Sequence, residues 1–401
     1  MERFPRGRIP ELDGLRGIAI AMVLACHYLP IEVATRHGSL VAYLKVLLGF
    51  GWSGVDLFFV LSGFLIGGIL IDARESENFF GVFYTRRFFR IVPIYSVILL
   101  LFPLADFAVR SIRPGGFYWL FANPMPWFSY ATFTQNFWMA FHNSEGGNFL
   151  APTWSLAIEE QFYLTLPLLI RLLPRRKLMT WLPVIICCVP VLRTVLLLHW
   201  RPNVMAELTL TPCRADALLM GVLAAAVVRD DEWRERISRH SRHFRGLLIA
   251  LLAGVALLVR TAPGISFPPM RSFGFTWLAL FYVGVLLFAV TQRESWLSRR
   301  LRNRWLMWLG SIAYGLYLIH QPVQGLIYGF FGGRAPVIQQ WNDVKFALIS
   351  LVVTIFIARV SWLYFERPLV EVGHRWHYRP ARPVAGEEGE VAFAGANSVS
   401  S

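Results

Sequence analysis

The sequence predicts an all-α, polytopic integral membrane protein with about ten transmembrane helices and both termini in the cytoplasm. Of its 401 residues, 56% are hydrophobic and only 16% are charged, whereas ordinary soluble domains are about 25% charged. The apolar residues are grouped into stretches that can cross a hydrocarbon core about 30 Å thick. This composition excludes an ordinary soluble domain.

The apolar stretches give the positions of the predicted spans. These are 14–34, 54–72, 90–109, 150–172, 179–200, 214–228, 246–260, 273–291, 305–328 and 344–365. The region 117–141 also contains many aromatic rings, but its prolines and amides favour an interfacial or re-entrant segment over a span. The first apolar run leads directly into further spans, so no cleavable signal peptide is predicted.

The basic residues orient these spans. A cytoplasmic N-terminus puts the clusters at 86–90, 171–177, 229–245, 293–304 and 367–382 on the cytoplasmic side, as the positive-inside rule requires. Counting 117–141 as an eleventh span would place the second cluster outside, and Arg110 and Arg113 are the exceptions to the assignment. Membrane loops therefore account for the net charge of +14, and no nucleic-acid partner is expected.

Residues 1–370 are predicted to form one membrane-embedded domain, and 371–401 a cytoplasmic tail. The tail is expected to be disordered because its last part is rich in Pro, Ala, Gly, Glu and Ser. The cysteines lack paired spacing, so neither a disulfide framework nor a metal site is predicted. They are Cys26, Cys187, Cys188 and Cys213.

The first predicted helix carries Arg16 and His27 on one face. Eleven positions at 100° and 1.5 Å per residue bring them within about 20° of each other and about 16 Å apart along the axis. Ionisable groups inside a membrane are candidates for function because they are costly to insert. His27 suits a general base. The alternatives are a packed, hydrogen-bonded His27 and an Arg16 that snorkels to the cytoplasmic surface.

Three arginines form a short cluster after the second span. Arg86, Arg87 and Arg90 are three and four positions apart, so a helix is expected to gather their guanidinium groups. Guanidinium forks suit phosphate groups. The alternative is a topology signal that binds lipid headgroups.

Further polar residues lie at the predicted outer ends of the spans. Asp56 is either a catalytic carboxylate or an acid favoured by the helix dipole. Glu159 and Glu160 point about 100° apart on a helix, so only one is expected to share a pocket with His27, and Glu159 is preferred. The other candidates at this surface are Trp154, Arg214, Asp216 and His320.

Several motifs occur in a fixed order along the chain. They are LDGLRG at 12–17 followed by His27, GVDLFFVLSGF at 54–64, RRFFRIVP at 86–93, TWSLAIEEQFY at 153–163, RADALLMG at 214–221, YGLYLIH at 314–320 and ERP at 366–368. Together these motifs resemble the membrane-bound acyltransferase-3 family of bacterial polysaccharide and antibiotic O-acyltransferases. The resemblance covers about residues 10–370. Some members carry an additional extracytoplasmic esterase-like domain, which is not expected in this chain.

The resemblance implies that an acyl group, commonly acetyl, moves from cytoplasmic acyl-CoA to a hydroxyl of a sugar or sugar-containing acceptor at the bacterial inner (plasma) membrane. It links the arginine cluster to the acyl donor and makes Arg16 and His27 functional residues. The acyl-CoA is expected as a co-substrate, with no tightly bound cofactor. The residues assigned to the donor are Arg16, Arg86, Arg87 and Arg90, and those assigned to the acceptor side are Trp154, Glu160, Arg214, Asp216 and His320.

In the resulting hypothesis, the donor arm lies along the face from Arg16 to His27. His27, oriented by Glu159 or Asp56, removes the proton of the acceptor hydroxyl. Direct transfer is expected, and a covalent relay through Ser62 or His27 stays open. The main alternative is a membrane transporter or flippase of a polar or glycan substrate, although no inverted repeat is visible. A second alternative is a non-catalytic membrane sensor or scaffold.

Overall fold

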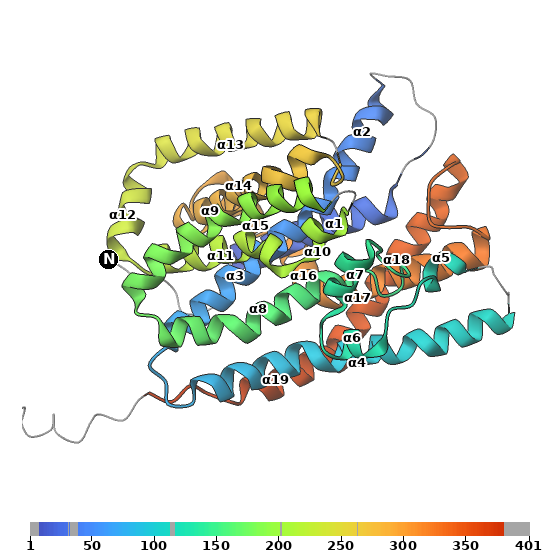
Figure 1. The fold of residues 1–401 in the computed structure, drawn as a ribbon, viewed down its shortest axis with the longest axis horizontal. Helices are drawn as coiled ribbons and strands as arrows, with labels where there is room; N and C mark the ends of the chain where they lie inside the picture. Colours follow the sequence, from blue (N-terminus) through green and yellow to red (C-terminus); the bar gives the residue numbers. More distant parts are fainter. Residues whose placement is uncertain are drawn as a thin grey trace, which may run out of the picture.

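The structure is a computed structural model, and it describes residues 8–30, 32, 39–112, 117–200, 203–262 and 264–380. Within these ranges the regular elements are helices and there is no β-strand. The long helices lie beside one another along the long axis of the molecule (Figure 1). The predicted all-α class is therefore confirmed.

The helices are named here in chain order with their bounds. They are α1 (Pro10–Tyr28), α2 (Leu40–Gly49), η1 (Phe50–Ser53), α3 (Gly54–Asp72), α4 (Phe79–Ile112), α5 (Tyr118–Phe121), α6 (Trp127–Ala131), α7 (Gln135–His142), α8 (Thr153–Leu172), α9 (Arg175–His199), α10 (Met205–Thr209), α11 (Thr211–Val228) and α12 (Asp231–Arg239). The second half of the chain contains α13 (Ser241–Thr261), η2 (Met270–Gly274), α14 (Phe275–Thr291), α15 (Trp296–Leu301), α16 (Arg304–Ser311), α17 (Ala313–Ile327), η3 (Tyr328–Gly332), η4 (Trp341–Asp343), α18 (Val344–Ser361), η5 (Trp362–Glu366) and α19 (Arg367–His374).

Seven stretches of the described residues are long and apolar enough to cross a membrane. They are Leu40–Asp72, Phe79–Ile112, Arg176–His199, Met205–Val228, Ser241–Thr261, Met270–Thr291 and Trp341–His374. The three other predicted spans correspond to α1, α8 and α16 with α17. The first two carry charged residues, and α17 has only 15 residues. The total of ten spans and the orientation of the termini stay predictions.

The region 117–141 forms no single long helix. It is divided into α5, α6 and α7, which have 4, 5 and 8 residues. Asn123 and Phe133 have positive φ angles of 47° and 53° between these helices, a conformation that a continuous helix cannot contain. The segment is thus broken in the way expected of an interfacial or re-entrant region.

Glycines bring α3 and α11 into close contact. A Cβ atom on Gly63 would lie 1.9 Å from the carbonyl oxygen of Leu218, and one on Gly221 would lie 2.2 Å from that of Val60. Both obstacles are backbone atoms, which cannot rotate away. The crossing of these two helices therefore depends on the absence of side chains at both positions.

Replacing Gly63 with alanine should lower the free energy of unfolding by about 1–3 kcal/mol, because the added methyl group forces the two helices apart. Thermal unfolding of the purified protein in detergent measures the change. Gly81→Ala in α4 is the matched control, since a Cβ atom at this position would have nothing within 4 Å, and alanine favours a helix by about 1 kcal/mol over glycine. Equal effects at the two positions would contradict the packing argument.

Buried ion pairs also join the helices. Arg193 in α9 is fully buried and bonds to Asp216 of α11 at 3.0 Å, while the hydroxyl of Thr276 in α14 donates to the same carboxylate at 2.6 Å. Further pairs connect Arg214 with Asp56 at 2.6 Å and Arg271 with Glu207 at 2.7 Å. These pairs fix the registers of several helices, because breaking one leaves a buried charge without a partner.

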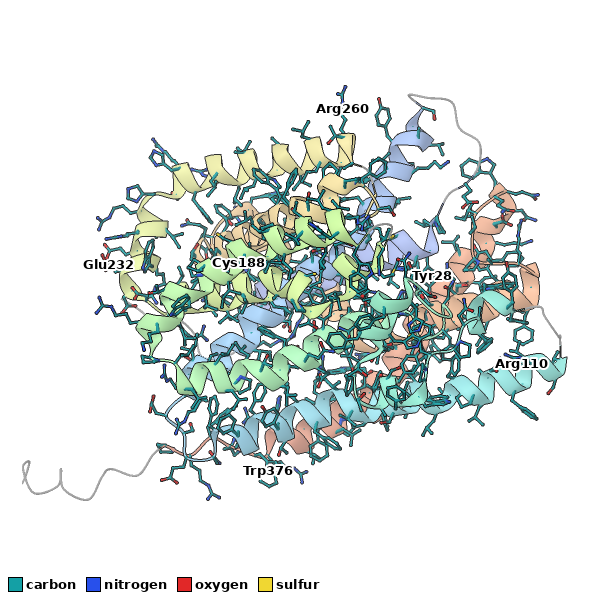
Figure 2. The ribbon with its side chains drawn as sticks, in the orientation of Figure 1. Tyr28, Arg110, Cys188, Glu232, Arg260 and Trp376 are labelled. Carbon is teal, nitrogen blue, oxygen red and sulfur yellow. The ribbon has the colours of Figure 1, made fainter. Side chains whose placement is uncertain are left out.

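The chain beyond residue 370 packs against α4 and then, as far as Pro380, against the segment that precedes α4. The predicted boundary at 370 falls inside α19, and the side chain of Asn78 donates to the His377 carbonyl oxygen at 3.0 Å. Trp376 lies near the first half of α4, far from Arg110 at the other end (Figure 2). The remainder of the predicted tail, 381–401, lies outside the described residues, as does Arg113.

Candidate active site

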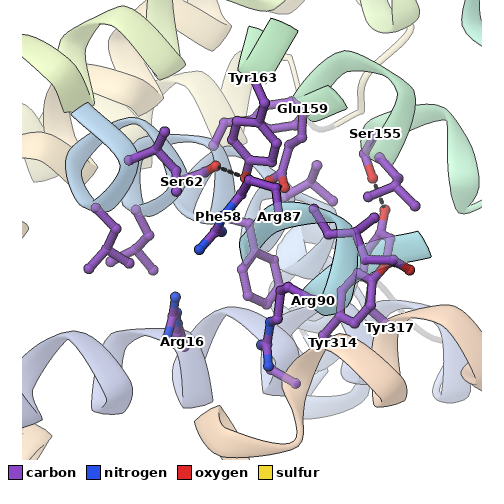
Figure 3. A pocket seen from close by; sticks show the side chains of 18 of the residues that line it. Arg16, Phe58, Ser62, Arg87, Arg90, Ser155, Glu159, Tyr163, Tyr314 and Tyr317 are labelled. Carbon is purple, nitrogen blue, oxygen red and sulfur yellow. Dashed lines mark hydrogen bonds between the residues drawn. The ribbon is translucent and has the colours of Figure 1, made fainter. Parts of the chain in front are cut away.

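A cavity between α1, α3, α4, α8, α16 and α17 collects most of the predicted donor-side residues. Its lining includes Arg16 of α1, Arg87 and Arg90 of α4, and Glu159 of α8 (Figure 3). Its volume is about 890 Å³, counted with the space at its open mouth. We call this cavity the arginine pocket.

Aromatic rings hold two of the three guanidinium groups of this pocket. Arg87 lies over the Tyr163 ring at 5.9 Å, and Arg90 lies over the rings of Tyr314 and Trp362 at 5.6 and 5.5 Å. Such cation–π contacts hold a guanidinium plane in place and leave its N–H donors free at the edge. Arg87 and Arg90 are three positions apart and therefore share a face of α4.

Glu159 belongs to a chain of hydrogen bonds on one wall of the arginine pocket. The Tyr163 hydroxyl donates to Oε2 of Glu159 at 2.9 Å, and the hydroxyls of Ser62 and Tyr163 are 2.5 Å apart. Glu159 and Tyr163 are four positions apart on α8, which places them on one face. The carboxylate supplies negative charge that compensates part of the surrounding arginine charge.

Arg86 does not line the arginine pocket. Its guanidinium group donates to the Trp376 carbonyl oxygen at 3.0 and 2.7 Å and lies over the Tyr378 ring at 5.2 Å. The expectation that the helix gathers three guanidinium groups in one place is therefore wrong for Arg86. Residues 86 and 87 point about 100° apart on a helix, so one faces the pocket while the other anchors the C-terminal segment.

A second cavity, which we call the histidine pocket, adjoins the arginine pocket. Val55 and Tyr317 line both cavities. Four predicted site residues besides His27 contribute to the lining of the histidine pocket. They are Asp56, Trp154, Arg214 and His320. The structure thus brings together residues from α1, α3, α8, α11 and α17.

His27 and His320 form a pair in the histidine pocket. Their ring centroids are 4.8 Å apart, with the rings inclined at 68°. Nδ1 of His27 lies 2.8 Å from the Val23 carbonyl oxygen, and Nδ1 of His320 lies 2.6 Å from that of Tyr317. A carbonyl oxygen only accepts hydrogen bonds, so each Nδ1 carries a proton and each Nε2 of the neutral rings is left as a base.

The hydrogen bonds of His27 differ from those expected. In the described part of the chain its ring bonds to the Val23 carbonyl and to neither predicted carboxylate. Glu159 lines the other cavity, and Asp56 is paired with Arg214. The alternative of a hydrogen-bonded His27 therefore holds for Nδ1, while its imidazole still lines two cavities.

Asp56 and Arg214 form a buried ion pair, and both line the histidine pocket together with the two imidazoles. Nη2 of Arg214 lies 2.6 Å from Oδ1 of Asp56, and the guanidinium group lies 4.0 Å from the centroid of the Phe275 ring. Nε and Nη1 of Arg214 and Oδ2 of Asp56 have no hydrogen-bond partner among the described residues. These three atoms are buried, and both residues line the histidine pocket.

The remaining predicted acceptor-side residues lie elsewhere. Asp216 pairs with Arg193 inside the bundle, and Glu160 is absent from the linings of the pockets described. Arg193 itself was not among the predicted residues, although an arginine in the middle of an apolar span is a signal that sequence reasoning can detect. Tyr317, which lines both pockets, is not an ionisable residue of this kind and gave no such signal.

This fold and this site define a multi-pass membrane protein with a polar cavity system built inside its helix bundle. The chain belongs to the acyltransferase-3 family, and the family's acyltransferase-domain model matches residues 9–363. The resemblance drawn from the motifs is therefore confirmed.

Two relatives show how far the similarity extends. Peptidoglycan O-acetyltransferase OatA of Listeria monocytogenes is 27% identical over 392 residues, which cover 92% of this chain and 57% of that protein. The chain thus matches little more than half of this relative. Acyltransferase MdmB of Streptomyces mycarofaciens is 28% identical over 400 residues, which cover 94% of both chains. No solved structure matches the chain.

Proposed function

We propose that the protein is a membrane O-acyltransferase that moves an acyl group, commonly acetyl, from acyl-CoA to a hydroxyl of a sugar-containing acceptor. The observation that carries the proposal is the junction of two pockets at Val55 and Tyr317. One pocket is lined by three arginines and the other by two imidazoles with basic Nε2 atoms. The name of the Listeria relative supports a carbohydrate acceptor.

The donor enters through the arginine pocket. Arg16, Arg87 and Arg90 bind the phosphate groups of acyl-CoA with charge-assisted hydrogen bonds. The arm that carries the thioester continues past Tyr317 into the histidine pocket. The distance along α1 from Arg16 to His27, about 16 Å, gives the depth that this arm has to reach. On the predicted orientation, the donor comes from the cytoplasm.

The transfer takes place beside His27. Its Nε2 takes the proton of the acceptor hydroxyl as the oxygen attacks the thioester carbonyl carbon. A C–O bond forms, the C–S bond breaks, and the coenzyme A thiolate leaves with the proton that His27 then returns. Arg214, which lines the histidine pocket, stabilises the negative charge on the carbonyl oxygen during attack. Atoms and protons balance without a covalent acyl-enzyme.

The rival route is a covalent intermediate in which Ser62 carries the acyl group. Its hydroxyl bonds to Tyr163 in the arginine pocket, whereas the two imidazoles lie in the histidine pocket. We therefore favour direct transfer. Membership of an acyltransferase family does not favour the transporter or flippase alternative. Labelling of an acceptor that depends on radiolabelled acetyl-CoA separates an acyltransferase from a transporter.

Substitutions of two neighbouring arginines, Arg87 and Arg86, test the assignment of the donor site. Arg87→Gln should raise the KM for acetyl-CoA about tenfold or more, because a hydrogen bond to a charged group contributes about 1.5–3 kcal/mol. Arg86→Gln is the matched control, since Arg86 bonds to Trp376 outside the pocket. Initial rates in purified membranes at varied acetyl-CoA give both values. Equal KM values for the two variants would remove the arginine pocket as the donor site.

A further inference from the structure

His27 lies at the end of α1, where the helix no longer supplies all of its own hydrogen bonds. The helix ends at Tyr28, and the backbone N–H of Leu29 donates to the Ala25 carbonyl oxygen. The next residue, Pro30, has no N–H, and the last four carbonyl groups of any helix lack donors within it. The backbone that carries His27 therefore depends on donors from outside α1.

His320 lies at a similar interruption in α17. Pro322 is inside this helix, two positions beyond His320. Because proline has no N–H, the Leu318 carbonyl group loses the donor that a regular helix would give it. Helical hydrogen bonds alone therefore hold both histidine positions incompletely.

Side chains of the two helices connect these two positions. Nε2 of Gln324 in α17 donates to the His27 carbonyl oxygen at 2.6 Å. In the opposite direction, the Tyr28 hydroxyl of α1 donates to the His320 carbonyl oxygen at 2.8 Å. The Tyr28 oxygen also lies 2.6 Å from the hydroxyl of Thr354 in α18. We call Tyr28, Gln324 and Thr354 the clasp, and all three side chains are buried.

The imidazoles follow the backbone that the clasp holds. Nδ1 of His27 lies 2.8 Å from the Val23 carbonyl oxygen. Nδ1 of His320 lies 2.6 Å from the carbonyl oxygen of Tyr317. Each ring is thus fixed to its own helix, and the two ring centroids are 4.8 Å apart across α1 and α17. The place of each Nε2 is therefore set by how the clasp aligns the two helices.

We propose that Gln324 is a positioning residue for the general base His27, and that Tyr28 holds α17 where Gln324 reaches the His27 carbonyl. This inference rests on the proposed function. Gln324 acts through the backbone of His27 and takes no part in the reaction itself. A displacement of about 1 Å in a reacting group costs about 100-fold in rate, so loss of this bond lowers the rate of the chemical step.

Gln324→Met tests this role, because it removes the N–H donor and keeps an unbranched side chain of similar length. Its kcat should fall about tenfold or more, while the KM for acetyl-CoA stays within about twofold, since the arginine pocket is unchanged. Trp277→Phe is the matched control. Nε1 of Trp277 in α14 donates to the Leu251 carbonyl oxygen of α13 at 2.9 Å, a bond of the same kind between two other helices. Equal losses of kcat in the two variants would overturn the proposal.

Tyr28→Phe removes the opposite bond of the clasp and keeps the ring. It should also lower kcat more than it changes the KM for acetyl-CoA. The double variant with Gln324→Met should lose less than the product of the two single losses, because both residues act on one alignment of the helices. Losses that multiply fully would contradict a single clasp.

Hydrogen exchange measured by mass spectrometry gives a readout that does not depend on catalysis. In Gln324→Met the amides of the peptide 24–29 should exchange about fivefold faster, because one hydrogen bond of this helix end is lost. Trp277→Phe should leave the same peptide unchanged, and an unchanged rate in Gln324→Met would overturn the proposal. If Gln324→Met keeps its kcat while His27→Gln is inactive, the positioning role is wrong and the proposed function stands. If the unmodified chain transfers no acetyl group from acetyl-CoA, the proposed function fails, and the exchange rates still decide whether Gln324 holds the end of α1.

Discussion

Replacing His27 with alanine should reduce acyl transfer by about 10²–10⁴-fold, because a positioned general base contributes that factor. Nδ1 of His27 is held by the Val23 carbonyl, so Nε2 is the atom that takes the proton. The neighbouring imidazole of His320 does not replace it without moving, since His320 is fully buried and its Nδ1 is held by the Tyr317 carbonyl oxygen. Transfer of radiolabelled acetyl from acetyl-CoA to endogenous acceptor in purified membranes measures the loss.

Two further variants serve as controls: one for the loss of any histidine, and one for a folding defect caused by the alanine substitution. His199→Ala removes an exposed histidine at the end of α9 and should leave the rate unchanged. His27→Gln keeps a polar side chain of similar length without a base, and it should be as inactive as the alanine variant while its yield in the membrane stays normal. Substantial turnover by either His27 variant would show that another group takes the proton.

Replacing Asp56 with alanine should lower the free energy of unfolding by about 3–5 kcal/mol, since it leaves the buried Arg214 guanidinium group without its partner. Asp56 and Arg214 are each only 1% exposed, so water cannot replace the lost contact. Thermal or denaturant unfolding in detergent micelles gives the value. The same measurement on Arg214→Met gives the second side of a double-mutant cycle.

The double variant Asp56→Ala with Arg214→Met decides what the pair does. Removing both charges should restore most of the stability lost in Asp56→Ala, because no uncompensated charge remains. Acyl transfer should stay low, since the guanidinium group of Arg214, a residue that lines the histidine pocket, is gone. Full recovery of activity together with stability would show that the pair is structural and takes no part in the reaction.

The close packing of helices at small residues could be anticipated from the sequence. Which site residues line the same pocket could not. Gly63 lies in a glycine-containing span, and the packing of small residues in lipid is a local rule. Glu159 was preferred as the carboxylate beside His27, but it lines the arginine pocket instead. Helical spacing decides which residues share a face of one helix, and it carries no information about which neighbouring helix meets that face.

The split between Arg86 and Arg87 shows the same limit at shorter range. The cluster is visible in the sequence, and its charge and spacing suit phosphate. Which member enters the cavity depends on the rotation of α4 about its axis. That rotation is set by packing against α19, by the bond from Arg86 to Trp376, and by the aromatic rings that hold Arg87 and Arg90.

The sequence by itself determined that this protein is a helical membrane protein, and its ordered motifs placed it in an acyltransferase family. Apolar stretches and motif order are properties of short segments, so no tertiary contact is needed to detect them. Only the tertiary structure decided the partners of the polar residues. Asp56 meets Arg214 across 158 positions of sequence, and His27 meets His320 from another helix. These pairs form because burial leaves each polar group dependent on whichever partner the helix packing brings within reach.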